Sequence, residues 1–145
     1  MKALVIGEAP GVYVAGAEPL TGTVASKIIR YAGISMNDYL SLTERTNLFR
    51  NPVTRWHNDE AMAAAEGIRE QTMMQGQRVV LLGVRVATAF GVKDLSLYKW
   101  HDHRLPFGGH AYVIRVPHPS GRNLLLNDPK ERERFGIAFV SALDL

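Results

Sequence analysis

Short apolar runs alternate along the chain with segments of helical periodicity. Residues 2–6, 78–83 and 112–116 are stretches of strand length in which most side chains are apolar. Such runs are typical of strands that are buried on both faces of a sheet. The segment 39–49 also carries several large apolar residues, and we interpret it as a second strand in chain order that leads into an Asn-Pro loop.

Two segments early in the chain predict helices. Residues 22–33 place apolar side chains mainly at helical spacing and stop at Gly33, a residue type that commonly ends helices. Asn58 is a suitable N-cap, and the two acidic residues that follow it suit the positive end of a helix. This second helix is predicted to run to about Met74.

Further helices are predicted in the second half of the chain. Residues 84–90 are small or apolar and are closed by Gly91. The segment Asp128-Pro129-Lys130-Glu131 supplies an N-cap, a proline at the first helical position and a glutamate at the third. It predicts a last helix that ends near Leu143.

Two other stretches have no regular pattern. Residues 94–109 contain two histidines, a proline and two glycines, and we predict an irregular loop there. The run Leu124-Leu125-Leu126 is interpreted as a buried packing segment before the last helix, with an apolar wedge into DNA as the alternative.

The order of these elements predicts the class of fold. Strands that are separated by helices imply a mostly parallel sheet, because parallel neighbours need crossover connections. We therefore expect an α/β protein in which a single three-layer domain, residues 1–145, has a mostly parallel central sheet flanked by helices. The length suffices for one ordinary hydrophobic core.

Composition narrows the classes of function. The chain has no cysteine, which excludes a disulfide framework, a thiolate metal site, an iron–sulfur cluster and a cysteine nucleophile. The apolar run at the N-terminus is too short for a signal peptide or a membrane span. We expect no membrane association and a cytoplasmic location, either in a cell or, for a viral protein, in the cytoplasm of its host.

The charge balance favours a polyanionic partner. The formal net charge is +3, and twelve of the seventeen basic residues are arginine, whose planar donor fork matches phosphate. Several arginines are predicted in loops, namely Arg45, Arg50, Arg55, Arg104 and Arg122.

Two loops at opposite ends of the chain carry groups capable of catalysis. Gly7-Glu8-Ala9-Pro10-Gly11 follows the first predicted strand, and His118-Pro119-Ser120-Gly121 follows the last. In open α/β sheets ligands bind at the carboxyl ends of the strands, so both loops can border one crevice. Glu8 could orient a water molecule, and His118 could donate a hydrogen bond to an oxygen that gains charge. The alternatives are an exposed turn carboxylate and a structural histidine.

Asn47 ends the predicted strand 39–49. Its amide both donates and accepts hydrogen bonds and can match the edge of a uracil-like base, the alternative being an ordinary turn asparagine. His101 and His103 have a spacing that could chelate a metal, but no histidine spacing in the chain requires one. We expect neither a metal nor a cofactor.

Several motifs together resemble the uracil-DNA glycosylase superfamily, most nearly its family-four members. The motifs fall in the order and rough spacing of that superfamily over most of the chain. They are Gly7-Glu8-Ala9-Pro10-Gly11, Glu18-Pro19-Leu20-Thr21-Gly22, Thr46-Asn47, Leu81-Leu82-Gly83 and His118-Pro119-Ser120. The resemblance implies a monofunctional DNA glycosylase, a hydrolase that cleaves the bond between deoxyribose and a uracil or related pyrimidine flipped out of DNA.

The resemblance also implies roles for individual residues. Glu8 would position the attacking water, and His118 would stabilise the departing base. The base pocket would be formed by Gly7, Ala9, Pro10, Gly11, Tyr13, Leu20 and Asn47. DNA would be contacted by Ser120, Gly121, Arg122 and Asn123, with Arg122 as the wedge or phosphate contact.

Two departures from the family pattern leave the substrate open. Family-four enzymes hold an iron–sulfur cluster with four cysteines, and this chain has none. Leu20 stands where the family has an aromatic residue that stacks on the base, a role that Tyr13 could take over. A larger or modified pyrimidine is therefore an alternative substrate. The alternative functions are a non-catalytic module that binds DNA or senses bases, and a small-molecule enzyme; the oligomeric state is left open.

Overall fold

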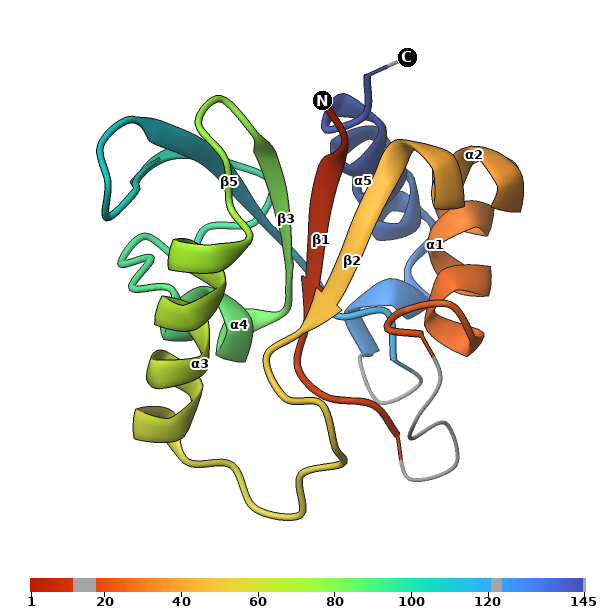
Figure 1. The fold of residues 1–145 in the computed structure, drawn as a ribbon. Coiled ribbons are helices and arrows are strands. Elements are labelled where there is room, and N and C mark those ends of the chain that lie inside the picture. Colours follow the sequence, from red (N-terminus) through yellow and green to blue (C-terminus); the bar gives the residue numbers. More distant parts are fainter. Residues whose placement is uncertain (12–17, 121–123, 145) are drawn as a thin grey trace.

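A five-stranded sheet with helices on both faces forms the centre of the molecule (Figure 1). The computed structural model describes residues 1–11, 18–120 and 124–144. The strands are β1 (Ala3–Gly7), β2 (Thr43–Asn47), β3 (Arg78–Leu82), β4 (Trp100–Arg104) and β5 (His110–Val116). The helices are α1 (Thr23–Ala32), α2 (Met36–Leu42), α3 (Asn58–Gln71), α4 (Val84–Ala89), the short 3-10 helix η2 (Leu124–Asn127) and α5 (Pro129–Ser141).

The sheet has the strand order β2-β1-β3-β5-β4. The first four strands are parallel, and β4 joins the edge antiparallel to β5. The register pairs Gly7 with Asn47, and Leu82 with Val116, so these parallel strands end at one edge of the sheet. The predicted α/β class, with a mostly parallel sheet in a three-layer domain, is confirmed.

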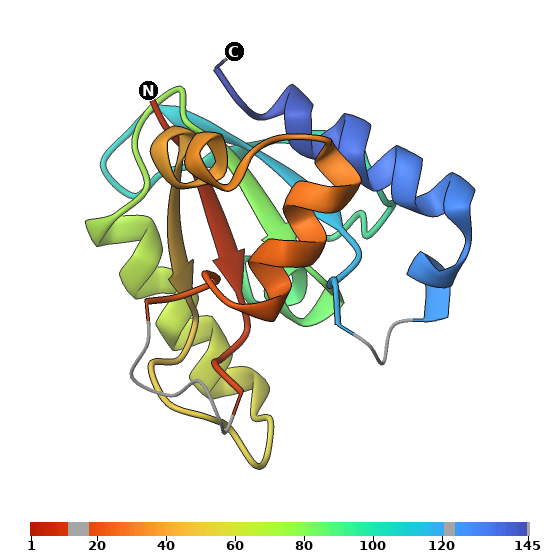
Figure 2. The ribbon, with the colours of Figure 1, turned by 90° about the vertical axis from the view of Figure 1, so that its right-hand side faces the viewer.

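Each face of the sheet has its own apolar core. In β1, Val5 packs with α1, α2 and α5, whereas Leu4 and Ile6 point to the opposite side, toward α3 and α4. Figures 1 and 2 show these two helical layers on either side of the sheet. Because both faces are covered, successive strand residues are buried, which explains the continuous apolar runs in the sequence.

The predicted ends of two helices are confirmed. Gly33 ends α1 in the left-handed region at φ 68°, where a side chain would be strained. Asp128 precedes α5 and accepts a hydrogen bond from the backbone N–H of Lys130 at 2.9 Å, with Pro129 at the first helical position.

The strand predicted over 39–49 was too long. Residues 36–42 form α2, whose N-cap Ser35 accepts a hydrogen bond from the backbone N–H of Asp38 at 3.0 Å. Tyr39 is buried in the core shared with α1 and α5. The apolar residues of this stretch therefore follow a helix first, and only residues 43–47 belong to the sheet. Arg45 consequently lies in a strand and not in a loop.

The irregular loop predicted over 94–109 contains strand β4. Its sequence, Trp-His-Asp-His-Arg, has no apolar run because it lies at the edge of the sheet and is held by backbone pairing with β5. Arg104 ends this strand and is not a loop residue.

The start of α3 also differs from the prediction. His57 occupies the N-cap position, and Asn58 is the first helical residue. The side-chain oxygen of Asn58 accepts a hydrogen bond from Trp56 Nε1 at 3.2 Å and does not cap the helix. The two acidic residues do lie in the first turn, and the helix ends at Gln71, earlier than expected.

The leucine run before α5 is only partly buried. Leu126 packs in the core with 4% of its surface exposed, whereas Leu124 and Leu125 are 76% and 41% exposed. The interpretation as a buried packing segment therefore holds for Leu126 alone.

Candidate active site

The loops after β1, β3 and β5 meet at the carboxyl edge of the sheet. The backbone N–H of Gly83, just after β3, donates to the carbonyl oxygen of Val116 in β5 at 2.8 Å. A Cβ atom built on Gly83 would lie 3.3 Å from the Cβ of His118 and 3.9 Å from Oε2 of Glu8. The carboxylate and the imidazole, which are far apart in the sequence, therefore approach each other over Gly83.

Glycine at position 83 makes this approach possible. Its φ is 97°, in a region that residues with side chains rarely adopt, and a Cβ atom at this position would lie 3.9 Å from the backbone nitrogen of His118. The Leu-Leu-Gly motif thus has a physical meaning: two buried strand residues are followed by a turn that leaves room for His118.

His118 lies in a partly buried position after β5. Burial lowers the pKa of its imidazole; the charge of Glu8 opposes this shift and the charge of Lys27 adds to it. The ring therefore stays neutral further into the acid range than a free histidine does. The backbone N–H of Ser120 donates to the His118 carbonyl oxygen at 2.8 Å and closes the turn around Pro119.

Glu8 is held by a loop that continues the pairing of β1 with β2. The backbone N–H groups of Leu48 and Phe49 donate to the carbonyl oxygens of Gly7 and Glu8 at 2.9 and 3.1 Å. The Glu8 side chain is 26% exposed, and its Oε1 lies 3.5 Å from Nη1 of Arg85. The carboxylate is accessible to water and has Arg85 as a cationic neighbour.

Asn47 and Leu20 close over Gly7. A Cβ atom on Gly7 would lie 2.5 Å from Asn47 Oδ1 and 2.9 Å from Leu20 Cδ2, so any larger residue here would displace the ends of these two side chains. Within the described part of the chain, Asn47 Oδ1 is buried and has no hydrogen-bond partner. A buried acceptor in this state is unfavourable unless a ligand supplies a donor.

Leu20 has a backbone conformation that is rare for its residue type. Its φ is 57°, and its carbonyl oxygen accepts a hydrogen bond from the hydroxyl of Tyr39 at 2.8 Å. Strain of this kind is often found at ligand sites. Tyr39 in α2 thereby supports the loop that carries Leu20.

The remaining predicted site residues divide into two groups. Ala9, Pro10 and Gly11 extend the Glu8 loop, where the first two are partly buried and Gly11 is exposed. Tyr13, Gly121, Arg122 and Asn123 lie outside the described residues, so their predicted roles stay predictions.

Sequence reasoning missed Arg85, Trp56 and Tyr39. Arg85 lies two residues after Gly83, and its Cζ is 5.1 Å from the centre of the Trp56 ring. The position of Arg85 directly after a strand-end glycine was a usable signal. The contact of Tyr39 with Leu20 and that of Trp56 with Arg85 join residues distant in the chain and had no local signal.

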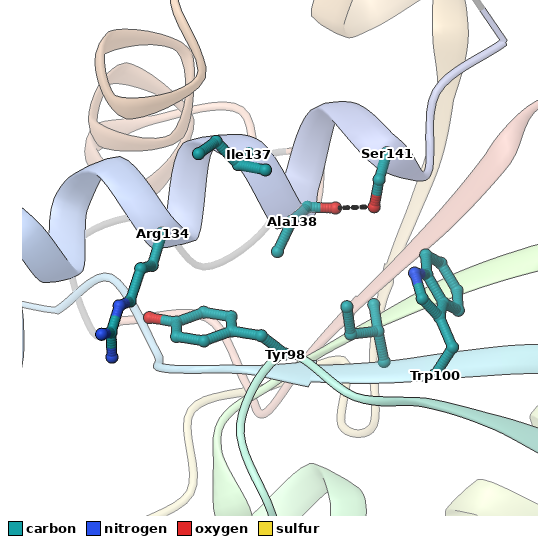
Figure 3. A pocket seen from close by; sticks show the side chains of 7 residues that line it. Tyr98, Trp100, Arg134, Ile137, Ala138 and Ser141 are labelled. Carbon is teal, nitrogen blue, oxygen red and sulfur yellow. Dashed lines mark hydrogen bonds between the residues drawn. The ribbon is translucent and has the colours of Figure 1, made fainter.

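Three surface cavities lie elsewhere on the molecule. The one in Figure 3 has a volume of about 410 Å³ and lies between α5 and the strands β4 and β5, with Tyr98 and Trp100 along its wall. The other two lie beside Met1 and beside Arg69. Among the described residues that line these cavities, none is a predicted site residue.

Clusters of metal-ligand side chains and membrane-spanning helices are both absent from the described residues. No group of three or more histidine or acidic side chains that could hold a metal ion occurs among them. Of the helices in residues 1–11, 18–120 and 124–144, none combines the length and apolarity needed to cross a bilayer.

Comparison with known proteins adds no relative. No protein-family model matches the chain, and no curated protein sequence matches it significantly. The functional argument therefore depends on the residues and geometry described above.

Proposed function

We propose that this protein is a DNA glycosylase that hydrolyses the N-glycosidic bond of uracil or a related modified pyrimidine flipped out of DNA. The observation that carries the proposal is the approach of Glu8 and His118 over Gly83. A solvent-accessible carboxylate beside a neutral imidazole suits a reaction in which water attacks one side of a bond and a base leaves from the other.

In the proposed reaction the oxygen of a water molecule bonds to C1′ of deoxyribose while the C1′–N bond breaks. The electron pair of the broken bond leaves with the base. Glu8 orients the water, accepts its proton and offsets positive charge on the sugar. His118, kept neutral by burial, donates a hydrogen bond to the base oxygen that becomes negative. Because that charge develops as the bond breaks, the interaction favours the transition state.

Asn47 is the proposed reader of the base. Its buried Oδ1, which has no hydrogen-bond partner among the described residues, can accept an N–H from a pyrimidine edge. Leucine gives an apolar contact without an aromatic face, so the proposal includes pyrimidines larger than uracil.

The direct test measures base release from oligonucleotides that contain uracil, 5-hydroxymethyluracil or another modified pyrimidine, as single strands and in duplexes. We expect alkali-labile abasic sites. Glu8→Gln should reduce the rate by about 10²–10⁴-fold, and His118→Ala by about 10²–10³-fold.

Two substitutions of exposed residues are matched controls. Glu44→Gln, in β2, and His110→Ala, at the start of β5, make the same chemical changes away from the site and should retain wild-type rates. Absence of base release from every substrate would overturn the proposal.

A second candidate is a DNA-binding or base-sensing module without catalysis. Leu20 favours it, because this side chain lies against Gly7 beside Asn47 and offers no aromatic face on which a flipped base could stack. Salt-sensitive DNA binding with no product in a single-turnover assay would select this function.

A further inference from the structure

Arg85 is placed between the Glu8 carboxylate and an aromatic ring. Its Nη1 lies 3.5 Å from Glu8 Oε1, and its Cζ lies 5.1 Å from the centre of the Trp56 ring. The Arg85 side chain is 57% exposed, so one side of the guanidinium faces solvent beside the candidate site.

Trp56 is a fixed platform for this arginine. Its ring meets the ring of Phe49 edge to face at a centroid distance of 5.4 Å, and its Nε1 donates to Asn58 Oδ1 at 3.2 Å. Phe49 in turn is tied through its backbone N–H to the carbonyl oxygen of Glu8. The position of Trp56 is therefore coupled to the Glu8 loop, and the cation–π contact holds Arg85 next to the site.

The loop between β2 and α3 adds further positive charge. Arg50 and Arg55 are both exposed in this loop, which extends beyond the carboxyl ends of β1 and β2 (Figures 1 and 2). We name Arg50, Arg55, Trp56 and Arg85 the arginine shelf. Asp59 and Glu60, exposed in the first turn of α3, are acidic residues just after the loop.

The contact between Glu8 and Arg85 is suited to exchange. It joins two solvent-accessible side chains at 3.5 Å, and such ion pairs are weak. A phosphate group offers two oxygens to the guanidinium fork and carries a full negative charge. An anion of this kind can therefore replace Glu8 while Trp56 keeps the arginine in place.

We propose that Arg85 binds a backbone phosphate of the DNA strand beside the flipped nucleotide, and that this binding releases the Glu8 carboxylate to the attacking water. The inference builds on the proposed function, because it assigns a contact of the same site with the DNA backbone. In the free protein the guanidinium of Arg85 pairs with the Glu8 carboxylate. In the complex it pairs with the phosphate instead.

The test measures affinity for a fluorescent single-stranded oligonucleotide of normal bases over a series of salt concentrations, so that no base release is needed. Arg85→Ala should weaken binding and reduce the slope of log affinity against log salt by about 0.7, the value for one phosphate contact on a single strand. Arg85→Lys should keep the slope, since it keeps the charge.

Arg78→Ala is the matched control. Arg78 is exposed at the amino end of β3, whereas Arg85 follows the carboxyl end of the same strand. The Arg78→Ala variant should keep the wild-type slope of log affinity against log salt. An unchanged slope in Arg85→Ala, or the same loss in Arg78→Ala, would overturn the inference.

A kinetic measurement distinguishes two roles of Arg85, namely binding a DNA phosphate and holding the Glu8 carboxylate in place during the reaction. On the substrate found in the base-release screen, Arg85→Ala should raise KM while kcat is retained, because Glu8 is free in the bound state. A fall in kcat at unchanged KM would contradict the exchange.

The two proposals can fail independently. If the wild type releases no base from any substrate but Arg85→Ala lowers the salt slope, the glycosylase proposal fails and the phosphate contact stands. If base release occurs and the slope does not change in Arg85→Ala, the phosphate contact fails alone.

Discussion

At the scale of single residues, Gly83 determines how closely the two candidate catalytic side chains can approach. Its positive φ and the 3.3 Å separation between a built Cβ and the Cβ of His118 are independent constraints. The first affects stability through backbone strain, and the second affects the site through displacement of the histidine. Substitutions can separate these two effects.

Gly83→Ala should lower the free energy of unfolding by about 1–3 kcal/mol, because φ 97° with ψ 166° is a backbone region nearly restricted to glycine, and should reduce base release by displacing His118. Gly91→Ala is the control, because Gly91 has φ 74° and open space around it. It should lose similar stability in urea denaturation but keep its activity. Full activity in Gly83→Ala would contradict the proposed role of the contact.

Two histidines make stability depend on pH. Burial, reinforced by the charge of Arg69, lowers the pKa of His103 from 6.5 to about 4, and burial lowers the pKa of His118. Arg69 Nε donates to His103 Nε2 at 2.9 Å, a bond that requires this nitrogen to be unprotonated. Both rings are therefore more easily protonated in the unfolded chain.

The direction of the pH dependence follows from proton uptake by the unfolded chain. Below the unfolded pKa of 6.5 the unfolded state binds more protons, so the free energy of unfolding should fall as the pH drops from 6.5 toward 4. Urea denaturation across this range measures the effect. His103→Gln and His118→Gln should each flatten the dependence, and equal slopes in the variants and the wild type would contradict the assignment.

At the scale of elements, the contact of α1 with α5 depends on one glycine. A Cβ atom on Gly136, within α5, would collide with the carbonyl oxygen of Tyr31 in α1. On the same side of the sheet, Phe135 and Phe139 stack with their ring centroids 6.2 Å apart. The two helices therefore pack at backbone distance, and no larger residue fits.

Gly136→Ala should destabilise the protein by about 1–3 kcal/mol, the range for overpacking a core. Gly67→Ala is the control, since Gly67 lies inside α3 with nothing near the built Cβ. It should stabilise by about 0.5–1 kcal/mol through helix propensity. Thermal or urea unfolding measures both. A neutral Gly136→Ala would show that α5 can move away from α1 at little cost.

The elements also show where sequence patterns succeed. The caps at Gly33 and Asp128 act through neighbouring backbone, so local sequence predicts them. Strand β4 was not predicted, because an edge strand pairs with one neighbour only and can be polar, so its sequence has no apolar run. The 39–49 segment was misjudged because Tyr39 and Leu42 suit a helix face as well as a strand. The Ser35 N-cap was a local signal for α2 that the prediction did not use.

At the scale of the whole molecule, the strand order brings the candidate site together. With β1 between β2 and β3, and β5 beside β3, residues that end or follow the four parallel strands meet at one edge: Asn47, Glu8, Gly83 and His118. The cavity under α5 lies at the other side of β5, against the edge strand β4 (Figure 3). The arginine shelf lies next to the candidate site, which supports the proposal of a DNA-binding surface there.

The sequence by itself determined the α/β class, the parallel sheet and the two loops that carry Glu8 and His118. These follow from local patterns, since burial on both faces produces apolar runs and turns have their own residue preferences. Only the tertiary structure decided the strand order, the position of Leu20 and Asn47 against Gly7, and the position of Arg85 between Glu8 and Trp56. These depend on contacts between residues distant in the chain, whose register and side-chain packing no local pattern encodes.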